Sequence, residues 1–189
     1  MRNAASDNGF CCLAETRVRM PFTPFHLGAG AAIKATIPRK FSFIIFWFVQ
    51  VVTDCETAYY IVTAQYPLHR WFHTYLGGTL VAVACVFIGV PLTNLVVTWL
   101  LGTRVRSPFR PISWKAGFYG TLLGSYSHVL LDSIVHPDVH PFRPFTTANP
   151  FYGVLSFHGI ELLCLTLGLG GLVWLMWRWS GIGTGAENP

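Results

Sequence analysis

Histidine and carboxylate side chains recur in this 189-residue chain at spacings that suit metal ligation. His128 and Asp132 are four residues apart and His136 follows after four more, so a helix would carry all three along one face. His69 and His73, in the segment HRWFH, have the same spacing, and a helical turn would point both imidazoles the same way. Mixtures of imidazole and carboxylate without thiolate suit Zn²⁺, Fe²⁺ or Mn²⁺.

Two more ionisable residues belong with this group. Asp54 lies inside an apolar segment, where such a side chain is expensive and by default marks function. His26 begins a shorter segment, and a hairpin about Pro38 would return it to the depth of Asp54. So many ligands predict one or two divalent ions, with Zn²⁺ as the first choice and Fe²⁺ or Mn²⁺ as alternatives.

The composition indicates what must position these residues. Hydrophobic residues make up 52% of the chain and charged residues 11%, against about 25% charged in soluble domains. The bilayer is the natural solvent for such a chain, and membrane lipid is its expected partner. The positive charges are scattered between apolar runs rather than clustered on one face, so no nucleic-acid partner is predicted. The five cysteines form no CxxC motif and predict no thiolate zinc site.

The apolar runs predict an all-α integral membrane bundle. A short helix is expected at 24–36, and four transmembrane helices at 41–63, 76–101, 114–135 and 154–179. Residues 20–180 are predicted to form a single membrane-embedded domain, followed by a flexible tail at 181–189. Residues 1–19 are either a loose tail or an annotation artefact, with translation starting at Met20.

Basic residues predict the orientation of this multi-pass protein. Arg39 and Lys40 precede the first long helix, and the loop after the second contains a further basic cluster, Arg104, Arg106, Arg110 and Lys115. The positive-inside rule places both groups on the cytoplasmic side. The ligand candidates then fall in or beside the outer half of the membrane, so the metal site is predicted toward the outer face.

The blocks that carry these residues resemble a known family. His26 in PFHLG, Asp54 in QVVTD, HRWFHT at 69–74 and SHVLLDS at 127–133 are similar to blocks of the bacterial membrane-bound metal-dependent hydrolases, also described as LexA-regulated inner-membrane hydrolases. The order of the residues distantly resembles zinc-dependent phospholipase C. The resemblance covers roughly residues 20–140 and implies a bacterial inner-membrane location. It implies these metal ligands: His26, Asp54, His69, His73, His128, Asp132 and His136.

The expected activity is hydrolysis of a phosphoester or other ester. Asp138 is the first candidate for the general base and Glu161 the second, while Arg70 or Arg143 would steady the developing negative charge. A site at the membrane boundary suits a lipid-like or small amphiphilic substrate. Two alternatives stay open, a cation-binding transporter and a metal-stabilised membrane protein without turnover. Arg70 and Arg143 could equally be snorkelling anchors, and Glu161 could simply pair with His158.

Overall fold

The structure is a computed structural model that describes residues 23–101 and 111–180. Predictions for the two tails and for Arg104, Arg106 and Arg110 lie outside these residues. The described part is all-helical, as predicted, with five helices and no strand. They are α2 (Thr23–Thr36), α3 (Phe43–Val62), α4 (Tyr75–Leu101), α5 (Trp114–Val135) and α6 (Phe157–Trp179).

Serine side chains fix the starts of three helices. Ser42 precedes α3 and accepts a hydrogen bond from the Ile45 N–H at 3.4 Å. Ser113 and Ser156 cap α5 and α6 in the same way. Each oxygen satisfies an N–H group that has no partner within the helix. Helix α6 therefore begins three residues later than predicted, directly after its serine cap.

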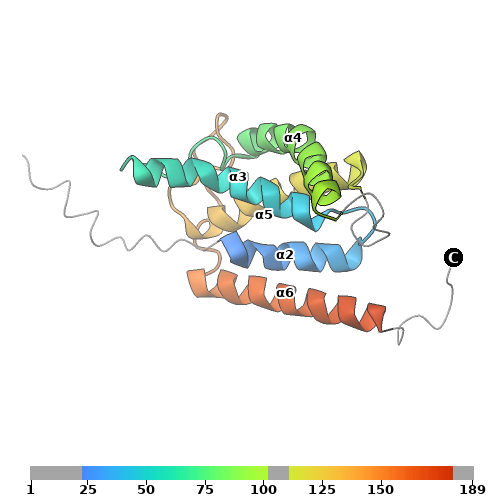
Figure 1. The fold of residues 1–189 in the computed structure, drawn as a ribbon. Coiled ribbons are helices and arrows are strands. Elements are labelled where there is room, and N and C mark those ends of the chain that lie inside the picture. The colour runs from blue at the N-terminus through green and yellow to red at the C-terminus, as the bar shows by residue number, and fades with distance from the viewer. Residues whose placement is uncertain (1–22, 102–110, 181–189) are drawn as a thin grey trace, which may run out of the picture.

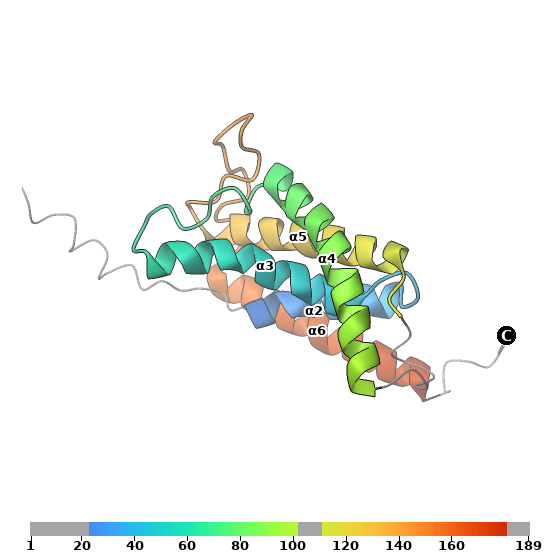
Figure 2. The same ribbon diagram turned by 45° about the horizontal axis from the view of Figure 1, so that its top comes forward.

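Helix α5 is the centre of the bundle, because it contacts all four other described helices (Figures 1 and 2). Its face toward α3 is lined by glycine, and a Cβ at Gly124 would lie 2.5 Å from Val49 and 2.9 Å from the Phe46 carbonyl. The missing side chain allows the two backbones to approach closely. The polar residues on the inner face of α5 are consequently buried.

Helices α3 and α5 start at the same end of the bundle. The Ser42 N–H, just before α3, donates to the Ala116 carbonyl in the first turn of α5 at 3.2 Å. The candidate ligands Asp54, His128 and Asp132 all lie in the later halves of these two helices. The candidate ligands of the two helices therefore lie toward one end of the bundle, next to the loops 63–74 and 136–156.

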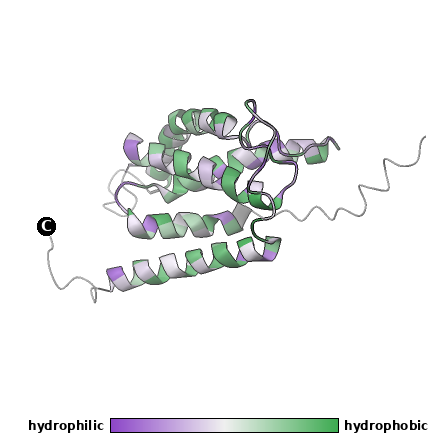
Figure 3. Ribbon diagram, turned by 180° about the vertical axis from the view of Figure 1, so that it is seen from behind, coloured by the Kyte–Doolittle hydropathy of each residue, from purple (hydrophilic) through white to green (hydrophobic). Residues whose placement is uncertain are grey.

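Helix α6 lies along α2 in both ribbon views. A Cβ at Gly171 would lie 2.7 Å from the Ala31 backbone, and Gly28 meets the Cys164 backbone too closely to accept any side chain. Small residues thus form this contact, as in helix pairs within membranes. The rest of α6 is largely exposed and apolar (Figure 3).

Two helices are long and apolar enough to cross a membrane, Tyr75–Leu100 and Phe157–Arg178. They present large exposed apolar side chains, including Phe87, Leu95, Trp99, Leu162, Val173 and Met176. Helices α3 and α5 have 20 and 22 residues, but the same test of length and apolarity does not select them. Their polar side chains, among them Gln50, His128 and Asp132, are buried inside the bundle. The prediction of four spanning helices is thus supported for two of them.

Candidate metal centre

Helix α5 contributes two buried ligand candidates one turn apart. His128 and Asp132 lie on its inner face and are 0% and 3% exposed. The His128 Nε2 atom is 3.2 Å from Asp132 Oδ2. Burial of an ionised carboxylate costs several kcal/mol unless it is paired, so this position demands a cationic partner.

Asp54 from α3 and His73 from the following loop meet this pair. Asp54 Oδ1 is 3.2 Å from His128 Nε2. His73 Nε2 is 3.3 Å from His128 Nε2 and 3.4 Å from Asp132 Oδ2. One atom from each of these four residues lies within 4.8 Å of every other. We call Asp54, His73, His128 and Asp132 the inner group.

These separations fit a tetrahedral metal site. Ligands about 2.0–2.1 Å from a zinc ion at tetrahedral angles are about 3.3 Å apart. The four separations given above range from 3.2 to 3.4 Å. Two imidazole nitrogens and two carboxylate oxygens also form a donor set that suits Zn²⁺, Fe²⁺ or Mn²⁺. The inner group could therefore hold a divalent ion.

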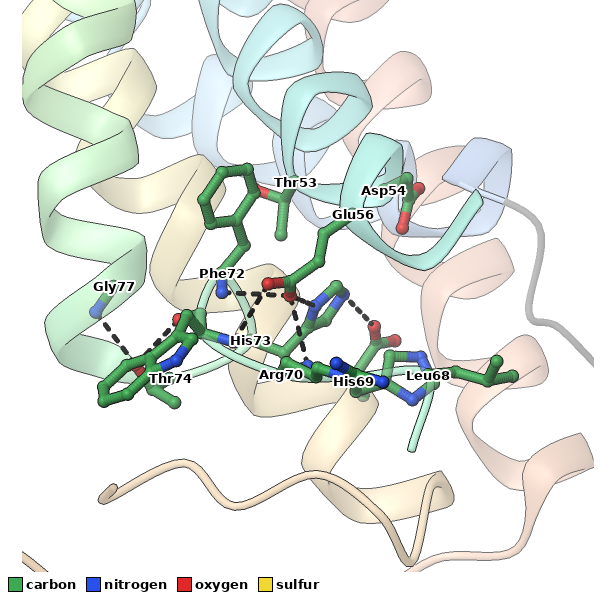
Figure 4. Close-up of polar contacts among 12 residues, drawn as sticks. Thr53, Asp54, Glu56, Leu68, His69, Arg70, Phe72, His73, Thr74 and Gly77 are labelled. Carbon is green, nitrogen blue, oxygen red and sulfur yellow. Dashed lines mark hydrogen bonds and ion pairs between the residues drawn. The ribbon is translucent and has the colours of Figure 1, made fainter. Parts of the chain in front are cut away.

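Glu56 fixes the orientation of His73, a role that the sequence analysis missed. Its carboxylate accepts hydrogen bonds from the backbone N–H groups of Arg70, Trp71 and Phe72 at 3.0–3.1 Å. It also contacts His73 Nδ1 at 3.2 Å, as Figure 4 shows. A proton on Nδ1 leaves the Nε2 lone pair free to face the inner group, the usual arrangement of a metal-binding histidine. The sequence signal was a second acidic residue in an apolar helix.

His26 lies against the inner group from α2. Its Nδ1 atom is 3.3 Å from His128 Nδ1, and its Nε2 atom is 3.5 Å from Asp132 Oδ1. If His128 binds a metal through Nε2, its Nδ1 carries the proton, and His26 Nδ1 accepts it. The proton of a neutral His26 then sits on Nε2, facing Asp132. This geometry favours His26 as an orienting partner of both α5 ligands.

A second group of candidates lies between the two loops. One ligand atom each from His69, His136 and Asp138 lies within 4.8 Å of the other two, and we call these residues the loop group. The rings of His69 and His136 stack with centroids 4.4 Å apart. The His69 ring also meets the His73 ring edge to face at 4.6 Å. The loop group therefore adjoins the inner group.

Asp138, the first candidate for the general base, is engaged in holding His69. Its Oδ1 contacts His69 Nδ1 at 3.0 Å, and its Oδ2 accepts from the Leu68 and His69 backbone N–H groups at 2.9 and 3.1 Å. Burial raises the pKa of this carboxyl, but the hydrogen bonds and the His69 charge outweigh it and hold the pKa well below its usual range. Such a carboxylate is a poor proton acceptor at neutral pH.

The other catalytic candidates are placed differently. Arg70 donates through Nε to the Pro67 carbonyl at 3.0 Å, and its guanidinium lies 3.7 Å from the centre of the Tyr60 ring. Glu161 pairs with His158 at 3.0 Å at the start of α6. Arg143 is half-buried in the same 136–156 loop as Asp138, and its backbone N–H donates to the His140 carbonyl. The structure brings none of the three side chains into the inner group.

The inner group is open on one side. The Asp54 side chain is 33% exposed, whereas the side chains of His73, His128 and Asp132 are at most 4% exposed. Three ligands thus close the centre and the fourth faces outward. Water or a substrate could therefore reach the inner group from the Asp54 side.

Comparison with known proteins yields no match to a family model, a curated protein or a solved structure. The geometry itself defines the class, a helical protein with two apolar helices of membrane-spanning length and a buried His/Asp group that could hold a metal ion.

Proposed function

We propose that this chain is an integral membrane, metal-dependent hydrolase that acts on a phosphoester or other ester of a lipid-like substrate. The observation that carries the proposal is the convergence of four ligand atoms, all within 4.8 Å of one another, in which four of the six separations are 3.2–3.4 Å; the residues are Asp54, His73, His128 and Asp132. Their chemistry fits Zn²⁺ first, with Fe²⁺ or Mn²⁺ as alternatives. A bound divalent ion would supply Lewis acidity and an activated water.

Other residues of the chain orient the ligands and shape access to the site. Glu56 and His26 hold the ligand rings in place, and the buried side of the group excludes water. Asp54 lies at the exposed edge, where a substrate would approach.

The charge distribution supports a membrane orientation. Lys34, Arg39, Lys40 and Lys115 lie at the end of the bundle where α3 and α5 start, and the inner group lies toward the other end. In a bacterial inner membrane the positive-inside rule places the basic end in the cytoplasm. Four spanning helices, α3 to α6, then position the metal centre at the outer face. A lipid-like substrate could keep its tail in the bilayer while its head group reaches Asp54.

Metal analysis of the purified protein tests this proposal. We expect the wild-type chain to retain a divalent metal in detergent, and the variants His128→Ala and Asp132→Ala to lose it. His158→Ala is the matched control, because its side chain is 78% exposed and its ion pair, with Glu161, lies outside the inner group. Undiminished metal content in the two α5 variants would refute the centre. Hydrolysis of phosphomonoester, phosphodiester and carboxylester probes in mixed micelles would then define the reaction.

A further inference from the structure

We propose that the end of the bundle opposite the metal centre binds the phosphate head group of an anionic phospholipid. The site is a cavity of about 640 Å³ between the α2–α3 turn, the later half of α4 and the start of α5. We call it the basic cavity, because Lys34 and Arg39 line it. Its volume lies within the range of small-molecule sites. The inference needs a chain that lies in a membrane, but it does not depend on the proposed reaction.

The positive charges at the basic cavity have no counter-charge beside them. The carboxylates of the described residues lie in the later halves of α3 and α5, in the loop after α5 or at the start of α6, and they are Asp54, Glu56, Asp132, Asp138 and Glu161. Every ion pair of the described residues joins a histidine to one of these carboxylates, so neither Lys34 nor Arg39 has such a partner there. Uncompensated positive charge around a concave surface favours an anionic ligand.

Lys34 is held in place by carbonyl groups and keeps one donor free. Its side chain is half-buried, and its Nζ donates to the Pro38 carbonyl at 2.6 Å and to the Phe41 carbonyl at 2.9 Å. An ammonium group has three N–H donors, so one remains for a ligand. The two bonds also fix the α2–α3 turn, which carries the exposed Arg39. Ammonium and guanidinium groups are strong partners of phosphate oxygens.

The starts of two helices add to this positive potential. Ser42 and Phe43 at the start of α3, and Ser113 just before α5, line the same cavity. The N–H groups of a first helical turn have no partners within the helix, and the helix dipole favours an anion there. The bond from the Ser42 N–H to the Ala116 carbonyl, at 3.2 Å, holds the two starts together.

The opposite wall of the basic cavity is apolar and belongs to a helix of membrane-spanning length. Val97 of α4 lines this wall together with Ile112. Asn94 fixes the two segments to each other, because its Nδ2 donates to the Ile112 carbonyl at 3.1 Å and its Oδ1 accepts from the Ile112 N–H at 2.6 Å. Val96 and Leu100, beside Val97 along α4, are 42% and 64% exposed.

This wall distinguishes a phospholipid from free phosphate. Acyl chains would bury the apolar side chains, which inorganic phosphate would leave exposed. Basic pockets between membrane helices on the cytoplasmic side bind anionic lipid head groups in this way. In the orientation proposed above, the basic cavity lies at the cytoplasmic leaflet, so its lipid is separate from a substrate that approaches Asp54.

Lipid titration of the full-length chain in non-ionic detergent tests the inference. A fluorescent phosphatidylglycerol should bind, and phosphatidylcholine with the same acyl chains should not displace it. Arg39→Gln should weaken binding by about 5-fold, the effect of one cation on an anionic lipid. Lys34→Met should weaken it at least as much, and the exposed Arg39 keeps the test decisive if Lys34→Met does not fold. Lys40→Gln is the matched control, because Lys40 is exposed next to Arg39 but does not line the cavity.

Three outcomes would overturn the inference. Equal weakening by Arg39→Gln and Lys40→Gln would show that surface charge alone attracts the lipid. Displacement of the lipid by inorganic phosphate at equal concentration would exclude a phospholipid site. Loss of lipid binding in His128→Ala, with wild-type thermal stability, would place the lipid at the metal centre instead. Phosphatidylglycerol binding that depends on Arg39, in a wild-type protein without metal, would support this inference and refute the proposed function.

Discussion

His73 and His69 are held by the same device in two different surroundings. Each ring contacts a carboxylate through Nδ1, from Glu56 at 3.2 Å and from Asp138 at 3.0 Å. Each carboxylate also binds backbone N–H groups of the loop between α3 and α4, three for Glu56 and two for Asp138. His73 is completely buried and faces two ligands on α5, whereas His69 faces the loop residue His136.

The two pairs differ in the elements that supply their carboxylates. Glu56 lies on helix α3 and accepts hydrogen bonds from three backbone N–H groups of the 63–74 loop. These bonds hold the loop against the bundle, so His73 is fixed beside α5. Asp138 belongs to a second loop, so the His69 pair joins two loops to each other; the Tyr75 N–H bond to the Pro141 carbonyl, 2.8 Å, reinforces this junction. We therefore expect the inner group to bind metal more tightly than the loop group.

Replacement of the two histidines gives the largest expected effects. His73→Ala removes a ligand of the inner group and should lower metal affinity by more than about 100-fold, beyond the cost of losing an orienting partner. His69→Ala should change this affinity by less than about 10-fold, because His69 lies outside the inner group. Titration of the metal-free proteins with Zn²⁺ against a competing chelator measures both. An equal loss of Zn²⁺ affinity in the two variants would contradict the difference between His73 and His69.

Neutralising Glu56 tests the orienting carboxylate of the inner group. Glu56→Gln keeps the size of the side chain but replaces one acceptor oxygen with an amide donor that opposes the loop N–H groups. The metal affinity of the inner group should fall by about 10–100-fold. The Zn²⁺ competition assay measures this change, and Glu161→Gln, which neutralises a carboxylate outside the inner group, is the matched control. An unchanged affinity would show that His73 is positioned without Glu56.

The corresponding change in the other pair is Asp138→Asn. It should lower the metal affinity of the inner group by less than about 10-fold, because Asp138 holds His69 and not a ligand of that group. The Zn²⁺ competition assay checks this expectation. A larger loss of affinity in this variant would mean that the two carboxylate–histidine pairs form one cooperative unit.

The smallest effect is expected for Arg70→Ala. Arg70 lies in the same loop, but its contacts to Pro67 and Tyr60 are structural. Its removal should lower the free energy of unfolding by about 1–2 kcal/mol, the sum of a hydrogen bond and a cation–π contact. Metal content should not change. Thermal unfolding in detergent and metal analysis together check it, and a specific loss of hydrolysis with metal retained would return Arg70 to the catalytic residues.

The helices could be predicted closely from the sequence, because their signals are local. Apolar runs and polar loops located all five described helices, and most ends fell within two residues of those observed. The four-residue spacing correctly placed His128 and Asp132 on one face of α5, since helical geometry alone determines that relation. What the periodicity could not show was which helices leave large apolar side chains exposed.

Residue types and their spacing along the chain were thus sufficient to predict the helical class and the candidate ligand types, because both are local properties. Packing in three dimensions brings His73 to α5, Glu56 to His73 and Asp138 to His69. These relations join residues 17 to 70 positions apart, between Glu56 and His73 at one extreme and Leu68 and Asp138 at the other. They depend on how α3, α5 and two loops pack, and no local pattern encodes that packing.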